Sequence, residues 1–123
     1  MKPAPHLSEA EWAIMKTVWK RKLCSAQEIV EELASPMSWS PATIKTLLNR
    51  LLGKGALRFK KTGKAYLYSP AWTREQCRSR EAASFLDRVF DGALSPLLAH
   101  FIGSRRLSKK ELEELERILK GQP

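Results

Sequence analysis

Residues 40–53 read SPATIKTLLNRLLG, and this stretch decides the fold. Ser40 suits a helix N-cap because its hydroxyl can accept a backbone N–H, and Pro41 at the first helical position loses no needed donor. Apolar residues then recur at positions i, i+3, i+4, i+7 and i+8, which predicts a helix with one wide apolar stripe against a core. The stripe comprises Ile44, Leu47, Leu48, Leu51 and Leu52.

The opposite face of this predicted helix is polar and basic. Short or flexible polar side chains of this kind can enter the DNA major groove, which is about 12 Å wide. In helix-turn-helix proteins the N-terminal half of the recognition helix reads bases. We therefore expect base contacts from Ala42, Thr43, Lys45 and Thr46. Contacts with the DNA backbone, or of undecided kind, are expected from Ser40, Asn49, Arg50 and Lys54.

The sequence pattern changes directly after this helix. Over residues 57–69 apolar and polar residues alternate in two short runs, which predicts a β-hairpin. Gly63, in the turn between the runs, can adopt the positive φ that a tight hairpin needs. With two more helices predicted upstream, this helix and hairpin are typical of a winged helix-turn-helix, with residues 40–53 as recognition helix and residues 58–66 as wing. The wing is expected to contact phosphates through Lys60, Lys61 and Lys64.

Two upstream helices are predicted by capping boxes, in which an N-cap Ser and a Glu three residues later each satisfy a backbone N–H. One box begins at Ser8 and the other at Ser25. The second helix is expected to end at Ser35, because Pro36 disfavours helical geometry at the residue before it. Trp39, just before the recognition helix, is expected either to pack on the core or to lie on the DNA sugar-phosphate backbone.

Residues 73–123 are predicted to form three more helices, about 73–90, 95–102 and 108–121. They hold more large apolar side chains than so thin a layer can bury by itself. A two-fold dimer is the default solution, and the alternative is a monomer whose tail packs on its own winged domain. The side chains expected in the dimer interface are Phe85, Leu86, Val89, Phe90, Leu94, Leu97, Leu98, Phe101, Ile102, Leu112, Leu115 and Leu119.

The charge of the chain is strongly positive and unevenly distributed. The net charge is +9, and residues 1–72 hold 12 Lys and Arg against 5 Asp and Glu. No acidic residue lies between Glu32 and Glu75, a span that includes the recognition helix and the wing. A one-sided block of this kind creates a positive potential that a polyanion would neutralise with release of counterions. The charge therefore favours nucleic acid as the partner.

Together these patterns predict a mainly α fold with a small β-hairpin wing. Residues 1–72 are assigned to a winged-helix DNA-binding domain and residues 73–123 to a helical dimerisation domain. No run of about 18 apolar residues is present and no signal-peptide core is seen near Leu7, so we expect a cytoplasmic protein without membrane insertion. Cys24 and Cys77 stand alone, without zinc spacing, so no metal or cofactor is expected. His6 and His100 complete no catalytic set, so we expect no enzyme.

Residues 7–12, 39–51, 54–57 and 84–92 resemble the penicillinase-repressor family, the group of BlaI, MecI and CopY type. The resemblance runs from Leu7 to about Leu119, nearly the whole chain. It implies a homodimeric transcriptional repressor that binds palindromic, double-stranded operators of the TACA/TGTA kind. It also implies control of β-lactam-resistance or related genes.

For the BlaI/MecI-like branch the resemblance further implies inactivation by proteolysis. A membrane-bound sensor protease would trigger cleavage in the dimerisation tail at an Asn-Phe bond, and the matching bond in this chain is His100-Phe101. Loss of the dimer would then remove the gain in affinity from two linked half-sites. The copper-responsive branch carries a C-terminal cysteine cluster, whereas this chain has no cysteine after Cys77. The resemblance therefore does not extend to copper sensing.

Two other functions remain open from the sequence. A winged helix can serve as a protein-interaction module without sequence-specific DNA binding, and it can also bind RNA. Binding to DNA through several phosphates should weaken by orders of magnitude between about 50 and 200 mM salt, whereas a protein interface should change far less. Competition between duplex DNA and RNA for the protein distinguishes DNA binding from RNA binding.

Overall fold

The computed structural model describes residues 4–121, and over this range the chain forms six helices and three short strands. The predicted fold class, mainly α with a small β-hairpin, is confirmed. The chain divides into two compact units between Glu81 and Ala82. Each unit is described by itself below.

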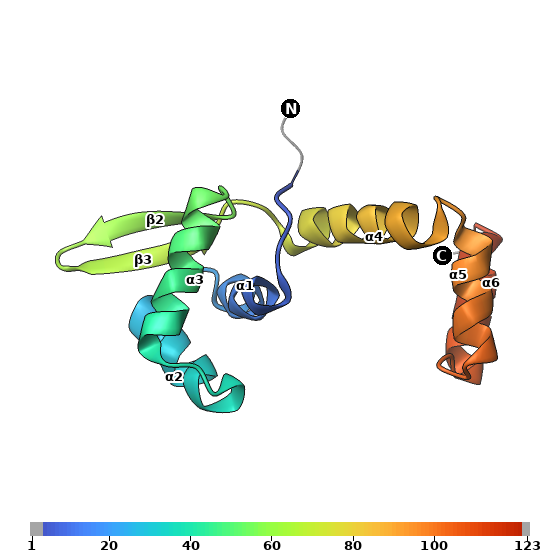
Figure 1. The fold of residues 1–123 in the computed structure, drawn as a ribbon, viewed down its shortest axis with the longest axis horizontal. Coiled ribbons are helices and arrows are strands. Elements are labelled where there is room, and N and C mark those ends of the chain that lie inside the picture. Colours follow the sequence, from blue (N-terminus) through green and yellow to red (C-terminus); the bar gives the residue numbers. More distant parts are fainter. Residues whose placement is uncertain (1–3, 122–123) are drawn as a thin grey trace. The chain divides into compact units, whose positions relative to one another are not determined.

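Three helices build the first unit: α1 (Glu9–Arg21), α2 (Ala26–Met37) and α3 (Pro41–Gly53) (Figure 1). The capping boxes predicted at Ser8 and Ser25 are both formed, with Glu11 and Glu28 as their partners. Ser40 caps α3, where its hydroxyl accepts the backbone N–H of Thr43 at 3.1 Å. Since only three residues separate α2 from α3, the two helices form a helix-turn-helix.

The expected end of α2 at Ser35 is wrong, because the helix continues through Pro36 to Met37. Pro36 lies in the last turn, so its ring removes a single backbone hydrogen bond near the end of the helix. The helix then closes on Ser38, which has left-handed geometry with φ of 55°. The backbone N–H of Trp39 donates to the carbonyl oxygen of Ala34 at 2.9 Å, which satisfies a carbonyl of the last turn.

The hairpin is formed by β2 (Leu57–Thr62) and β3 (Ala65–Pro70), which are antiparallel. Thr62 pairs with Ala65 across a two-residue turn, and Gly63 begins that turn with φ of 63°. A third strand, β1 (Cys24–Ser25), pairs with β3 and gives the sheet order β1-β3-β2. No sequence pattern predicts β1, because a strand of two residues is too short to show a period.

The core of the first unit lies among α1, α2, α3 and the base of the hairpin. The predicted stripe of α3 faces this core, with Ile44, Leu48 and Leu51 fully buried. Trp39 is half-buried and packs against the same cluster, in agreement with the first of its two expected roles. The stripe of α3 thus fixes which face of the helix points outward.

The helix α4 (Arg74–Phe90) begins in the first unit and ends in the second. The compact first unit reaches past the expected boundary at residue 72, because Cys77 of α4 is buried in its core. The carboxylate of Glu81 also accepts the backbone N–H of Leu7 at 3.4 Å. The first turns of α4 are therefore part of the winged-helix unit.

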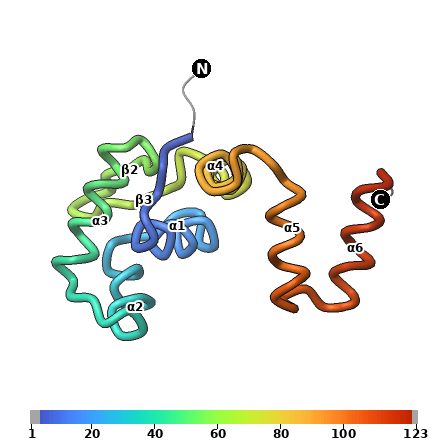
Figure 2. The backbone as a smooth tube through the Cα atoms, turned by 45° about the vertical axis from the view of Figure 1, so that its right-hand side comes forward, coloured from blue at the N-terminus to red at the C-terminus, as the bar shows by residue number. Residues whose placement is uncertain are grey.

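The second unit contains α5 (Leu94–Gly103) and α6 (Lys109–Leu119) after the end of α4. Figure 2 shows α5 and α6 side by side and running in opposite directions. Ser108 caps α6 through a capping box with Glu111, at the start of the helix predicted over residues 108–121. No side chain of α5 or α6 is fully buried within residues 82–121. This unit is a thin helical layer without a closed core.

Candidate nucleic-acid interface

The outward face of α3 carries the predicted base-reading residues together. Every one of them is exposed, and so are the residues predicted for backbone or undecided contacts on the same helix. The exposed set comprises Ser40, Ala42, Thr43, Lys45, Thr46, Asn49 and Arg50. The structure therefore brings these residues onto one accessible surface, and their contacts with DNA stay predictions.

Three hydroxyls on this face are already engaged in local hydrogen bonds. The hydroxyl of Thr46 donates to the carbonyl oxygen of Ala42 at 3.0 Å, and the hydroxyl oxygens of Thr43 and Ser40 lie 3.0 Å apart. Because the Thr46 proton is used in this way, Thr46 presents its methyl group and an acceptor oxygen to a ligand. Lys45 is therefore the flexible donor at the centre of this face.

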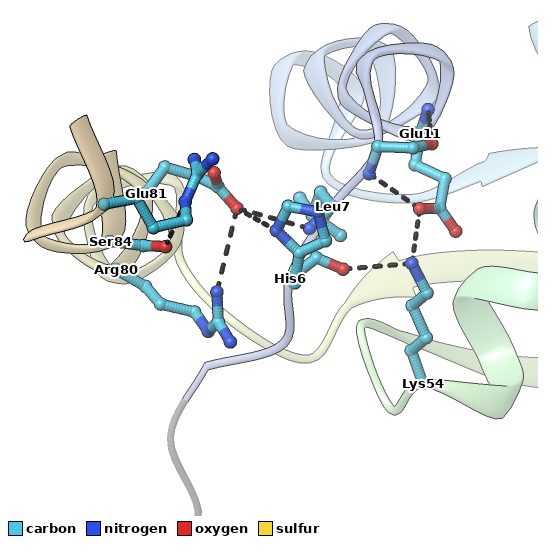
Figure 3. Close-up of polar contacts among 9 residues, drawn as sticks. His6, Leu7, Glu11, Lys54, Arg80, Glu81 and Ser84 are labelled. Carbon is cyan, nitrogen blue, oxygen red and sulfur yellow. Dashed lines mark hydrogen bonds and ion pairs between the residues drawn. The ribbon is translucent and has the colours of Figure 1, made fainter.

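Lys54 occupies a different place from the other predicted DNA contacts. Its ammonium group donates to the Glu11 carboxylate at 2.5 Å and to the carbonyl oxygen of His6 at 3.0 Å (Figure 3). Burial alone would raise the pKa of Glu11, but the hydrogen bonds from Lys54 and Ser8 outweigh it and lower the pKa below its usual value. Lys54 is thus held by a buried carboxylate at the C-terminal end of α3.

The predicted wing residues lie on different faces of the hairpin. In the register, Lys61 stands opposite Tyr66 and Lys60 opposite Leu67, so the side chains of Lys60 and Lys61 point to opposite faces. Lys61 shares its face with Tyr66, and its ammonium group lies 5.9 Å from the centre of that ring. Lys64 is exposed in the turn. Only Lys61 of these three cations therefore belongs to the aromatic face of the hairpin.

Two residues at this surface, Phe59 and Tyr66, are not among the predicted site residues. The alternation over residues 57–69 predicts only a strand position for Phe59 and Tyr66, yet these residues are 57% and 46% exposed. A hollow of about 230 Å³ lies between α3 and the hairpin, and these two rings line part of it. This exposure arises because the hairpin extends beyond the core. Strand periodicity does not indicate how far a hairpin extends, so it could not predict the exposure.

The predicted dimer residues form an apolar surface on the second unit. Some are exposed, such as Val89 at 53%, and the others are half-buried. The exposed members are Phe85, Val89, Leu94, Ile102 and Leu119, and the half-buried members are Leu86, Phe90, Leu97, Leu98, Phe101, Leu112 and Leu115. Ile118 on α6, absent from the expected set, is 62% exposed.

The bond between His100 and Phe101 lies inside α5, three residues before the end of that helix. His100 is exposed and Phe101 is half-buried, with their ring centres 6.0 Å apart. A protease needs its substrate in an extended form, so this bond is reached only when α5 opens locally.

Comparisons with known proteins agree with this geometry. A family model described as penicillinase repressor matches residues 7–121. The penicillinase repressor of Bacillus licheniformis is 37% identical over 119 residues, which cover 97% of this chain and 93% of that protein. The methicillin resistance regulatory protein MecI of Staphylococcus aureus strain N315 is 35% identical over 113 residues, which cover 92% of each chain.

A solved structure also matches the first part of the chain. It is the solution structure of the Bacillus licheniformis BlaI monomeric form in complex with the blaP half-operator. That protein is 39% identical, and the superposition has a TM-score of 0.55 and covers 62% of this chain and 93% of that one.

A helix-turn-helix with an exposed basic second helix and a following hairpin defines a DNA-binding transcriptional repressor of the winged-helix class. The sequence match over residues 7–121 identifies the family within this class of winged-helix repressors. The chain belongs to the penicillinase repressor family, as its sequence resemblance implied. Over residues 4–121 no helix combines the length and apolar character that a bilayer crossing requires.

Proposed function

We propose that this chain represses transcription as a homodimer that binds a palindromic operator, with α3 in the major groove and the hairpin on the adjoining phosphates. The observation that carries the proposal is the orientation of α3. Four of the five residues of its apolar stripe are buried in the core, so its polar, basic face is the outward one. The relative solved with a half-operator supports the same use of this unit.

The test is selection of bound duplexes from a random pool, followed by a salt titration of the best sequence. We expect a palindrome with half-sites about one helical turn apart and a fall in affinity of orders of magnitude between about 50 and 200 mM salt. If the selected duplexes share no sequence and the affinity for duplex DNA does not change with salt, the result would instead indicate a protein-interaction module. Equal competition by RNA would indicate an RNA-binding protein.

The proposed dimer is formed by the second unit. Support comes from its apolar surface, since the layer of α5 and α6 leaves large apolar side chains in contact with water. A symmetric pair of such layers would cover both surfaces and hold two copies of α3 for two half-sites. The proposal assigns no catalytic step to the chain and places its action in the cytoplasm.

We further propose that the chain controls β-lactam-resistance or related genes and is inactivated by proteolysis in α5, triggered by a membrane-bound sensor protease. Two features of α5 support local opening. Its N-cap, Ala93, supplies no side-chain hydrogen bond, and none of its side chains is fully buried. Opening at the His100-Phe101 bond would therefore disrupt few contacts within one protomer.

The test of this cleavage is co-expression with a sensor protease of the family and analysis of the fragments by mass spectrometry. We expect a cut after His100, faster in a His100→Asn variant and absent in a Phe101→Ala variant. Fragments that end elsewhere, or no induced fragment at all, would remove this part of the proposal without affecting operator binding.

A further inference from the structure

The hollow between α3 and the hairpin has two kinds of wall. α3 supplies Lys45, Asn49 and Leu52, and the strands supply Phe59, Tyr66 and Tyr68. Lys45 and Asn49 also belong to the outward face of α3, so the hollow is continuous with the candidate DNA surface. Figure 1 shows the hairpin extending from the unit beside α3.

The register of the hairpin concentrates the aromatic rings on this side. Phe59 stands opposite Tyr68 and Lys61 opposite Tyr66, so these four side chains share one face. The rings of Phe59 and Tyr66 meet edge to face, with centres 5.3 Å apart. Both rings nevertheless remain about half exposed, because the core ends at the base of the hairpin. The result is an apolar wall with cations at its border.

The chemistry of these walls limits what can occupy the hollow. A drug-sized ligand usually needs a pocket of about 300–1,000 Å³, and this hollow of about 230 Å³ is smaller. The flanking cations Lys45 and Lys61 favour an anion, whereas the rings of Phe59 and Tyr66 favour an apolar surface. The DNA backbone offers both in alternation, since deoxyribose presents C–H groups and phosphate carries the charge.

The position of the hollow favours the same occupant. A duplex with α3 in its major groove carries a sugar-phosphate ridge along the border of that groove, next to the bases being read. A hairpin that reaches phosphates beside α3 must pass this ridge. The hollow lies between the two elements that would stand on either side of the ridge.

We propose that the hollow receives the deoxyribose-phosphate backbone beside the bases read by α3, with Phe59 and Tyr66 packed on the sugars and Lys61 on a phosphate. The proposal rests on the proposed operator binding and adds an apolar, sequence-independent contribution to it. Such a contact positions α3 in its groove, because deoxyribose has the same shape at every base pair.

The first test compares the operator affinity of Phe59→Ala with that of the wild type at several salt concentrations. We expect Phe59→Ala to bind about tenfold more weakly, because an apolar contact is lost, with an unchanged slope of log affinity against log salt. Lys61→Ala should instead reduce the slope by about one phosphate contact. Phe59→Leu, which keeps an apolar side chain, should recover most of the affinity, and Leu23→Ala serves as a control at an exposed apolar residue outside the hollow.

The second test is hydroxyl-radical footprinting, which reports the solvent exposure of deoxyribose directly. In Phe59→Ala we expect one or two sugars of each half-site to become reactive while the rest of the footprint stays protected. An unchanged footprint with affinity within twofold of the wild type would overturn the proposal. A lower salt slope would overturn it too, because the ring would then act by stiffening the hairpin that carries Lys61. Failure of operator binding itself would appear in the wild type, before any variant is compared.

Discussion

At the scale of single residues, the proposed recognition depends on exposed side chains of α3 that do not contribute to the core. Lys45 and Thr46 are both exposed, so their replacement should leave the core intact. We expect Lys45→Ala and Thr46→Ala to lower the preference for operator over unrelated DNA by about tenfold each, since a lost base contact costs about 1–3 kcal/mol. Anisotropy titrations with operator and scrambled duplexes measure this ratio.

The environment of the Thr46 hydroxyl adds a sharper control. Because that hydroxyl donates to the carbonyl oxygen of Ala42, its methyl group is the part free to meet a thymine methyl. Thr46→Val should therefore keep more sequence preference than Thr46→Ser. If neither Lys45→Ala nor Thr46→Ala changes the preference, α3 does not read the bases.

Lys54 should behave differently from the cations of the outward face. Lys54→Ala leaves the Glu11 carboxylate, which is 1% exposed, without its cation. We expect the free energy of unfolding to fall by about 2 kcal/mol, because a buried charge then lacks its partner. The salt dependence of operator binding should stay as in the wild type. Urea unfolding and salt titrations of the same variant measure both quantities, and a reduced salt slope would show that Lys54 contacts phosphate after all.

At the scale of elements, α1 and α2 are joined through Glu32. Its carboxylate accepts hydrogen bonds from Lys20 at 2.8 Å and from the Thr17 hydroxyl at 2.7 Å, and these contacts lower its pKa to about 2. An unfolded Glu has a pKa of about 4.3, so the folded state binds the proton less tightly. The stability from this group is thus fully present above about pH 4.3 and is lost as the pH falls through about 2.

Glu32→Gln should therefore flatten the acid side of the stability curve. We expect a loss of about 1 kcal/mol near neutral pH, because these partners are partly exposed, and little difference from the wild type near pH 2. Urea unfolding at neutral pH, about pH 4 and about pH 2 gives the comparison. The neighbouring Glu31→Gln is the matched control, and an equal effect of both variants would contradict the role of the α1–α2 contact.

The elements also show where sequence reasoning succeeds and where it stops. The five-residue stripe of α3 and the alternation over residues 57–69 are long periodic signals, and the structure confirms both elements. Pro36 misled the prediction because a proline in the last turn removes only one bond, which the closure at Ser38 and Trp39 offsets. Whether a side chain such as Phe59 meets core or solvent depends on tertiary distance, which no local pattern contains.

At the scale of the whole molecule, operator affinity should depend on the second unit. Val89 and Ile118 are more than half exposed within one protomer, so a charge there should leave each protomer folded while it disrupts an apolar interface between two. We expect Val89→Glu and Ile118→Glu to be monomeric by sedimentation equilibrium. Ser104→Glu, in the exposed connection between α5 and α6, adds the same charge outside the apolar surface and should remain dimeric.

The affinities for the full palindrome and for a single half-site show whether the dimer contributes to operator binding. In a dimer the second α3 binds its half-site at a high effective concentration, so the full palindrome should be bound about 100-fold or more tightly than a single half-site. In Val89→Glu this ratio should fall towards one, while the affinity for the half-site stays at the wild-type value because α3 and the hairpin lie in the first unit. A monomeric wild type, or a monomeric variant that keeps the full ratio, would mean that the tail covers its apolar side chains within one chain and that repression needs no second copy.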